Sequence, residues 1–190
     1  MRLERWLFER LRPQLRGRRL VFLDESGVNR ALVRRYARAP RGERAYGKAP
    51  VNRGPNVTLI AALSQDGLLA PMQVEAATDG DVFRAYLEQV LCPELQRGDV
   101  VLMDNLPAHK VKGVRTQIES VGAELLYLPR YSPEYNPVEQ LWSKIKAWLR
   151  KVGARTAEAL DDAITVAFET ITAEDAKGWF SHCGYCIESK

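Results

Sequence analysis

Hydrophobic positions along the 190-residue chain fall into short apolar runs and into longer stretches with helical spacing. Five short runs have the length, the β-branched content and the flanking turn residues of strands. They cover residues 19–24, 57–64, 68–74, 99–104 and 124–128. The second and third runs are separated by the turn sequence Gln-Asp-Gly, which predicts a hairpin.

Apolar residues recur every three or four positions in the segments before, between and after these runs. This spacing predicts helices at residues 3–15, 81–91, 112–121, 137–151 and 156–171. Antiparallel strands come first, and strands that alternate with helices come later. We therefore expect an α/β protein with a mixed five-stranded sheet flanked by helices. This order of elements matches the ribonuclease H-like fold.

The length of the chain, with 46% hydrophobic and 27% charged residues, favours one globular domain. No run of 18 apolar residues occurs, and charges interrupt the N-terminal residues, which argues against a membrane span and a signal peptide. We expect a soluble, cytoplasmic protein. Residues 1–18 are interpreted as a helical lead-in to a domain formed by residues 19–190.

The three cysteines, Cys92, Cys183 and Cys186, form no disulfide framework, which agrees with a reducing compartment. Cys183 and Cys186, with His182 beside them, look like half of a zinc site. The sequence contains no second CxxC or histidine pair to complete it. Packing thiols are therefore the favoured interpretation.

Charge is distributed unevenly along the chain, whose formal net charge is +4. Residues 1–55 have a net charge of +10, and the remaining 135 residues have a net charge of −6. Residues 30–53 contain eight bases and one acid, with Tyr36, Tyr46 and several glycines and prolines between them. Such a segment is a poor helix or strand and suits contact with a polyanion. A solvated flexible loop is the alternative.

Candidate chemistry lies where two predicted strands end in an aspartate, Asp24 and Asp104. Ligands of α/β sheets bind at this edge, and a third acid, Glu139, stands at the start of a predicted helix. Carboxylates that gather at one place repel one another unless a cation lies between them. Hard oxygen ligands of this kind suit Mg²⁺ or Mn²⁺, and two such ions can promote cleavage of a phosphodiester.

Glu139 also has a local interpretation, because it lies in the segment YSPEYNPVEQLW (residues 131–142). Asn136 is the expected helix cap, and Glu139 has the capping-box position three residues later. On the helix, Glu139 lies beside the apolar stripe, on the side of Lys146 and Arg150. A carboxylate with two bases on its own face suits a metal ligand beside a DNA backbone. Both roles are compatible with the sequence.

The segments around the three acids resemble the signature blocks of the DDE transposases of the mariner-like insertion-sequence superfamily. These segments are FLDESG at Asp24, LMDNLPAHK at Asp104 and LPRYSPEYNPVEQLW at Glu139. The last two acids are separated by 34 residues, a spacing by which members of this group are named. The resemblance implies that all three acids are catalytic and coordinate two Mg²⁺ (or Mn²⁺) ions. It also implies nicking of the ends of an insertion sequence and transfer of the freed 3′ hydroxyl into target DNA.

Glu25, Asn105 and His109 are secondary candidates. Glu25 follows Asp24 and would point to the opposite side if the strand continues through it. Asn105 and His109 match positions that are often kept in this family, and His109 would contact phosphate or position water. A histidine in a surface loop is the competing interpretation.

Double-stranded DNA is the expected partner, with terminal repeats as the ends recognised and TA as the target dinucleotide that the resemblance implies. A homodimer in the synaptic complex and a cytoplasmic, nucleoid-associated location are further expectations. The expected phosphate contacts are Arg34, Arg35, Arg38, Arg41, Arg44, Lys48, Arg53, Lys144, Lys146 and Arg150.

Mariner-like transposases usually carry a helix-turn-helix region before the first aspartate, and here 23 residues precede Asp24. The resemblance therefore implies a helix-turn-helix partner protein, a frameshift fusion or a truncated relic. Two alternatives to a transposase stay open. One is another ribonuclease H-like nuclease, such as a junction resolvase or an RNA:DNA hybrid nuclease. The other is a non-catalytic DNA-binding protein derived from a transposase.

Overall fold

The computed structural model describes residues 2–34, 36–75 and 78–186. Five strands form one sheet in the order β3-β2-β1-β4-β5. They are β1 (Leu20–Val28), β2 (Val57–Ser64), β3 (Gly67–Val74), β4 (Val100–Met103) and β5 (Glu124–Tyr127). The pairs β1–β2 and β2–β3 are antiparallel, whereas β1–β4 and β4–β5 are parallel. The predicted mixed five-stranded sheet is confirmed.

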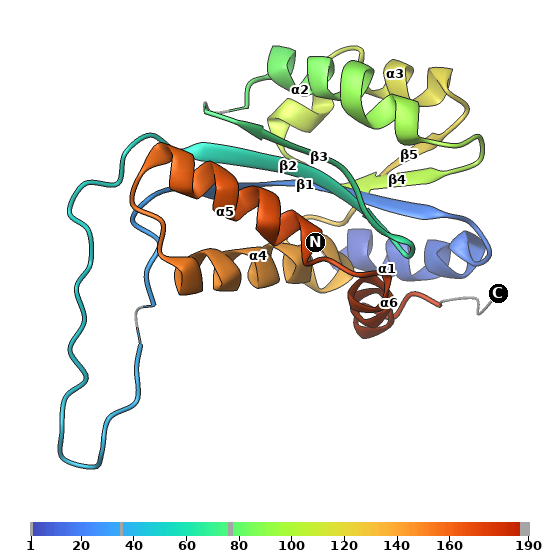
Figure 1. Cartoon of the computed structure of the whole chain (residues 1–190). Helices are drawn as coiled ribbons and strands as arrows, with labels where there is room; N and C mark the ends of the chain where they lie inside the picture. Colours follow the sequence, from blue (N-terminus) through green and yellow to red (C-terminus); the bar gives the residue numbers. More distant parts are fainter. Residues whose placement is uncertain (1, 35, 76–77, 187–190) are drawn as a thin grey trace.

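Helices cover both faces of this sheet. They are α1 (Arg2–Leu11), α2 (Gly80–Tyr86), α3 (Val114–Ser120), α4 (Val138–Val152), α5 (Ala157–Glu169) and α6 (Ala173–His182). A π-helical turn (Leu87–Leu91) and a 3₁₀ turn (Cys92–Glu94) continue α2, and further 3₁₀ turns lie at Arg12–Leu15, Pro107–Lys110 and Pro133–Tyr135. In Figure 1, α2 and α3 lie above the sheet, and α4 and α5 lie below it.

The alternation of side chains along β1 produces two hydrophobic cores. Phe22 packs in the cluster formed with α1, α4, α5 and α6, whereas Leu23 packs in the cluster formed with α2 and α3. Because β1 continues to residue 28, the same alternation sends Asp24 and Glu25 to opposite faces. Asp24 lies on the α4 side of the sheet, and Glu25 lies on the α2 side.

Several predicted element ends differ from the structure. The helix predicted at residues 3–15 gives way to a 3₁₀ turn after Leu11, since Pro13 has no N–H for an α-helical hydrogen bond. The helix predicted at 112–121 begins only after Gly113, whose φ of 104° is incompatible with a right-handed helix. Strand β4 ends at Met103, so Asp104 lies just beyond it.

Helix α6 was not predicted from the apolar pattern. It begins with a capping box, in which Thr172 and Asp175 exchange side-chain and backbone hydrogen bonds. Its Phe180 ring packs edge-on against Phe22, with 5.3 Å between ring centroids. Lys144 of α4 donates to Asp175 Oδ2 at 2.5 Å and to the Thr170 carbonyl at 2.9 Å. The Lys144 ammonium group therefore connects α4 to α6, and a phosphate contact at Lys144 stays a prediction.

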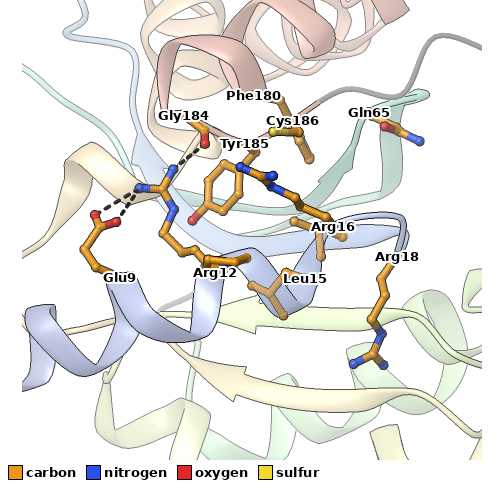
Figure 2. A pocket seen from close by; sticks show the side chains of 12 residues that line it. Glu9, Arg12, Leu15, Arg16, Arg18, Gln65, Phe180, Gly184, Tyr185 and Cys186 are labelled. Atoms are coloured by element: carbon orange, nitrogen blue, oxygen red, sulfur yellow. Dashed lines mark hydrogen bonds and ion pairs between the residues drawn. The ribbon is translucent and has the colours of Figure 1, made fainter.

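The two ends of the described chain are connected through Arg12 (Figure 2). Its guanidinium donates to Glu9 Oε1 at 2.9 Å, to the Cys183 carbonyl at 2.9 Å and to the Gly184 carbonyl at 2.5 Å. The same group lies 4.9 Å from the centre of the Tyr185 ring. These contacts hold the N-terminal segment against the end of α6.

The connection between β1 and β2 leaves the body of the molecule as a long extended loop (Figure 1, left). In its described residues 29–34 and 36–56, Tyr36 and Tyr46 are 92% and 88% exposed and have no core to pack against. This loop, called the basic loop below, contains the basic segment of residues 30–53. Arg35, one of the expected phosphate contacts, lies outside the described residues. No helix in the described part of the chain is long and apolar enough to cross a membrane.

Candidate active site

A cavity of about 490 Å³ lies where β4 ends, beside the middle of β1. The prediction that the first strand ends at Asp24 is wrong, because β1 continues to Val28. Asp24 reaches it from β1, Asp104 from the segment after β4, and Glu139 from the first turn of α4. The fold thus brings together three acids that are far apart in the sequence. The other lining residues are Asn105, Leu106, Leu128, Pro129, Arg130, Tyr131, Ser132, Pro133 and Asn136.

Asp24 is buried, with 8% of its surface exposed. Its Oδ1 accepts the backbone N–H of Glu25 at 2.8 Å, and its Oδ2 accepts the Asn136 amide at 3.3 Å. Burial raises the pKa of the Asp24 carboxyl to about 7, against the lowering effect of the Glu25 N–H. The carboxylates of Asp104 and Glu139 raise it further. The surroundings of Asp24 therefore disfavour the ionised form of its carboxyl.

The pKa of the Asp104 carboxyl is shifted in the opposite direction. Burial alone would raise the pKa of its carboxyl, but hydrogen bonding from His109 and from the Leu106 N–H outweighs burial and lowers the pKa. The Leu106 N–H donates to Asp104 Oδ1 at 2.9 Å, and His109 Nδ1 lies 2.7 Å from the same oxygen. Asp104 therefore stays ionised at a pH where Asp24 holds its proton for part of the time.

The start of α4 does not have the predicted capping box. No side chain caps this helix, and Asn136 has an extended backbone, with φ −112° and ψ 95°. Pro137 disfavours the helical conformation for the residue before it. The buried Asn136 side chain turns toward Asp24, and its Oδ1 has no hydrogen-bond partner among the described residues. Sequence reasoning missed this role, because asparagine before proline is the ordinary pattern of a helix cap.

The donor atoms around the cavity are chemically suited to a hard cation. They are carboxylate oxygens and the unpaired amide oxygen of Asn136. Within the described ranges, no three His, Cys, Asp or Glu side chains come close enough to enclose a metal ion by themselves. Mg²⁺ is often held by only one or two protein carboxylates, with water and substrate phosphates as the other ligands. The site fits that type of binding.

The secondary candidates have distinct places. Glu25 lies on the far side of β1, as expected, and its Oε1 is 3.7 Å from His109 Nε2. His109 is fully buried, so its interpretation as a surface-loop residue is wrong. Although burial lowers the pKa of His109, the two neighbouring carboxylates raise it to about 9. Asn105 lines the cavity, donates to the Leu128 carbonyl and accepts from Lys110 at 2.5 Å.

The remaining bases expected at phosphate lie on the basic loop and on α4. Arg34, Arg38, Arg41, Arg44, Lys48 and Arg53 are exposed on the loop. Arg150 of α4 lines a wide hollow together with the loop residues Arg34, Lys48 and Arg53. Lys146 is partly exposed on α4. These bases leave a positively charged surface beside α4.

Comparison with known proteins identifies one family model and several related transposases. A sequence model of the DDE superfamily endonucleases matches residues 19–161. The transposable element Tcb2 transposase of Caenorhabditis briggsae is 26% identical over 161 residues, covering 80% of this chain and 59% of the relative. The Tc1 transposase of Caenorhabditis elegans is 25% identical over 144 residues, covering 72% and 53%. The chain thus spans little more than half the length of these relatives.

Solved structures show the same fold. The Mos1 strand transfer complex has a TM-score of 0.75 at 20% identity and covers 95% of this chain and 56% of that chain. The catalytic domain of Mos1 mariner transposase has a TM-score of 0.61 at 16% identity and covers 97% and 92%. The predicted ribonuclease H-like fold is confirmed.

The raised pKa of Asp24 predicts a pH-dependent gain of stability in Asp24→Asn. The unfolded carboxyl, with an ordinary pKa of 3.8, ionises before the folded one, so the stability of the unsubstituted chain falls as the pH rises from about 4 to 7. Asparagine cannot ionise. We expect a gain of up to about 4 kcal/mol at pH 8 and little difference near pH 4. Urea unfolding with a chelator present measures the free energy of unfolding of both proteins at each pH. An equal difference between them at pH 4 and pH 8 would contradict the raised pKa of Asp24.

The position of Asn136 predicts that Asn136→Asp lowers the free energy of unfolding at pH 8 by about 3 kcal/mol or more, because it places a second buried carboxylate against Asp24. A capping residue would tolerate this change, since aspartate caps helices as well as asparagine. Thr156, whose hydroxyl accepts the Ala159 N–H at 3.1 Å, is the matched control. Thr156→Asp should unfold at nearly the same urea concentration as the unsubstituted chain. Equal tolerance at both positions would show that Asn136 is a cap after all.

Proposed function

The chain belongs to the DDE superfamily endonucleases, and from this membership we propose that residues 19–190 are the catalytic domain of a DNA transposase. The proposed reaction cuts the ends of an insertion sequence and joins the freed 3′ hydroxyls to target DNA. The observation that supports it most is that Asp24, Asp104 and Glu139 line one cavity, where β4 ends between the middle of β1 and the start of α4.

Asp24 and Asp104 are the proposed protein ligands of Mg²⁺ or Mn²⁺. Such ions, when bound, activate the attacking hydroxyl and stabilise the charge that develops on the phosphodiester. Asn136 and the Glu25 N–H orient the Asp24 carboxylate through its two oxygens. The Leu106 N–H orients Asp104 through Oδ1. The chain thus fixes both carboxylates at the wall of the cavity.

Glu139 has a different position from the two aspartates. Its side chain is exposed at the rim of the cavity, and within the described ranges it has no hydrogen-bond or ion-pair partner. An unpaired carboxylate at this point is available to complete a metal site or to accept a proton from the attacking hydroxyl. We propose it as the third catalytic acid.

Double-stranded DNA is the proposed substrate. The basic loop and Arg150 present guanidinium groups around a second hollow, at the C-terminal half of α4, and phosphate contacts of this kind provide affinity without base specificity. One similar solved structure is described as a Mos1 transposase paired-end complex with a left transposon end. TA as the target, a homodimer and a separate helix-turn-helix partner stay predictions.

The proposal predicts that Glu139→Gln abolishes Mg²⁺-dependent nicking of DNA that carries the terminal repeats. Glutamine has nearly the same shape but lacks the charge, so we expect a loss of roughly a hundredfold or more with folding and DNA binding retained. Glu134→Gln is the matched control, since Glu134 precedes α4 and its carboxylate pairs with Arg5 at 3.0 Å.

Nicking and strand-transfer assays, together with a gel-shift measurement, test this prediction. Normal nicking by Glu139→Gln would remove Glu139 from the catalytic set. An unsubstituted chain that binds DNA but never cuts it would favour the non-catalytic DNA-binding protein. Preferential cutting of branched or hybrid substrates would favour another ribonuclease H-like nuclease.

The basic loop predicts a salt-dependent part of DNA affinity. Replacing Arg38, Arg41, Arg44 and Lys48 with glutamine should weaken binding and reduce the slope of log affinity against log salt by up to about four. The control replaces four exposed bases elsewhere, Arg84, Arg97, Arg115 and Lys177. Fluorescence anisotropy at several salt concentrations measures both slopes. A smaller slope in the control than in the loop variant would place the DNA on another face.

A further inference from the structure

A buried histidine lies directly behind the candidate active site. His109 has no exposed surface, and its ring lies against Phe83 of α2 with 4.6 Å between ring centroids. The hydroxyl of Tyr127 on β5 donates to the His109 carbonyl at 2.8 Å. Contacts therefore fix both the backbone and the ring of His109, which belongs to the 3₁₀ turn Pro107–Lys110.

Both ring nitrogens of His109 face carboxylates. Nδ1 lies 2.7 Å from Asp104 Oδ1, and Nε2 lies 3.7 Å from Glu25 Oε1. Both are close polar contacts between the imidazole and a carboxylate, and the shorter one is to Asp104. A histidine that only filled space would not need an acid on each side.

Glu25 extends this arrangement to the other aspartate. Its backbone N–H donates to Asp24 Oδ1 at 2.8 Å, while its side chain faces His109 on the opposite side of β1. A continuous path of contacts therefore runs from Asp24 through Glu25 and His109 to Asp104. It connects β1 with the segment after β4 beneath the floor of the cavity.

The contacts on Asp104 all fall on one oxygen. Both His109 Nδ1 and the Leu106 N–H lie at Oδ1, and among the described residues nothing holds Oδ2. Asp104 has no strand neighbour to fix it, since β4 ends at Met103. Its direction toward the cavity depends on the contacts at Oδ1.

We propose that His109 and Glu25 are positioning residues. His109 contacts Oδ1 of Asp104 and so leaves Oδ2 for a metal ion. Glu25 in turn fixes the ring of His109. This inference rests on the proposed function, because it assigns Asp104 to metal binding. Partners of metal-binding carboxylates commonly change metal affinity by about 10- to 100-fold when they are removed.

Two substitutions of similar size separate positioning from packing. In His109→Asn the amide nitrogen stands close to the place of Nδ1 and can still reach Asp104. In His109→Gln the amide reaches further, toward the place of Nε2 and Glu25. The Mn²⁺ Kd of the full chain is measured by calorimetry, with thermal unfolding and DNA nicking in parallel. Asp104→Asn serves as the variant that removes the metal ligand itself.

We expect His109→Gln to weaken Mn²⁺ binding about tenfold or more, and His109→Asn to bind Mn²⁺ nearly as the unsubstituted chain does. Glu25→Gln, which keeps an acceptor for Nε2, should weaken binding less than Glu25→Ala. If a His109 variant does not fold, this Glu25 pair decides the question. Equal Kd values for the two Glu25 variants would then overturn the proposal.

Other results also separate this inference from the proposed function. Equal Mn²⁺ affinity in His109→Asn and His109→Gln, whether retained or lost, would overturn the positioning role. The proposed metal site would still stand if Asp104→Asn abolished Mn²⁺ binding. An unsubstituted chain whose Mn²⁺ binding is absent, or unchanged in Asp104→Asn, would overturn the proposed metal site and this inference with it.

Discussion

Repulsion between the carboxylates that gather where β4 ends beside β1 is the constraint on which the site depends. Parallel pairing of these strands brings Asp24 and Asp104 to one cavity, and Glu139 adds a third negative charge. The surroundings of the two aspartates differ. Asp24 is buried and its pKa is raised to about 7, whereas Asp104 has a buried histidine beside it and a lowered pKa. The protein thus keeps a poorly compensated group of acids, an arrangement that favours a cation more than it favours stability.

The groups that hold these acids come from elements that would otherwise have local roles. Asn136 stands where a helix cap is expected, yet it turns its amide toward Asp24, 112 residues away in the chain. His109 belongs to a short surface connection, yet its ring is enclosed between Phe83 and two carboxylates. In each case the partner is a carboxylate oxygen that the tertiary structure brings close, and the local preference yields to it.

Sequence reasoning succeeded where the signal is local. The five strands were placed to within a few residues, because apolar runs between turn residues leave few other structures. The three acids were chosen from the ends of those runs and from a helix start, and the structure brings them to one cavity. Reasoning failed for α6, where the apolar pattern was not recognised and Phe180 docks on Phe22 from the far end of the chain. It also did not anticipate the ion pair of Lys144, whose partner Asp175 belongs to that unpredicted helix.

The sequence by itself therefore determined the order of the elements and which segments form the strands of the sheet, since these follow from periodicity. It also determined the positions of the acids along the chain, since these follow from residue type. Only the tertiary structure decided which groups hold the acids, which acid keeps a proton near neutral pH and which bases are free. Those properties depend on burial and on contacts between residues distant in the sequence. Desolvation and Coulomb attraction act through space, and no local pattern records them.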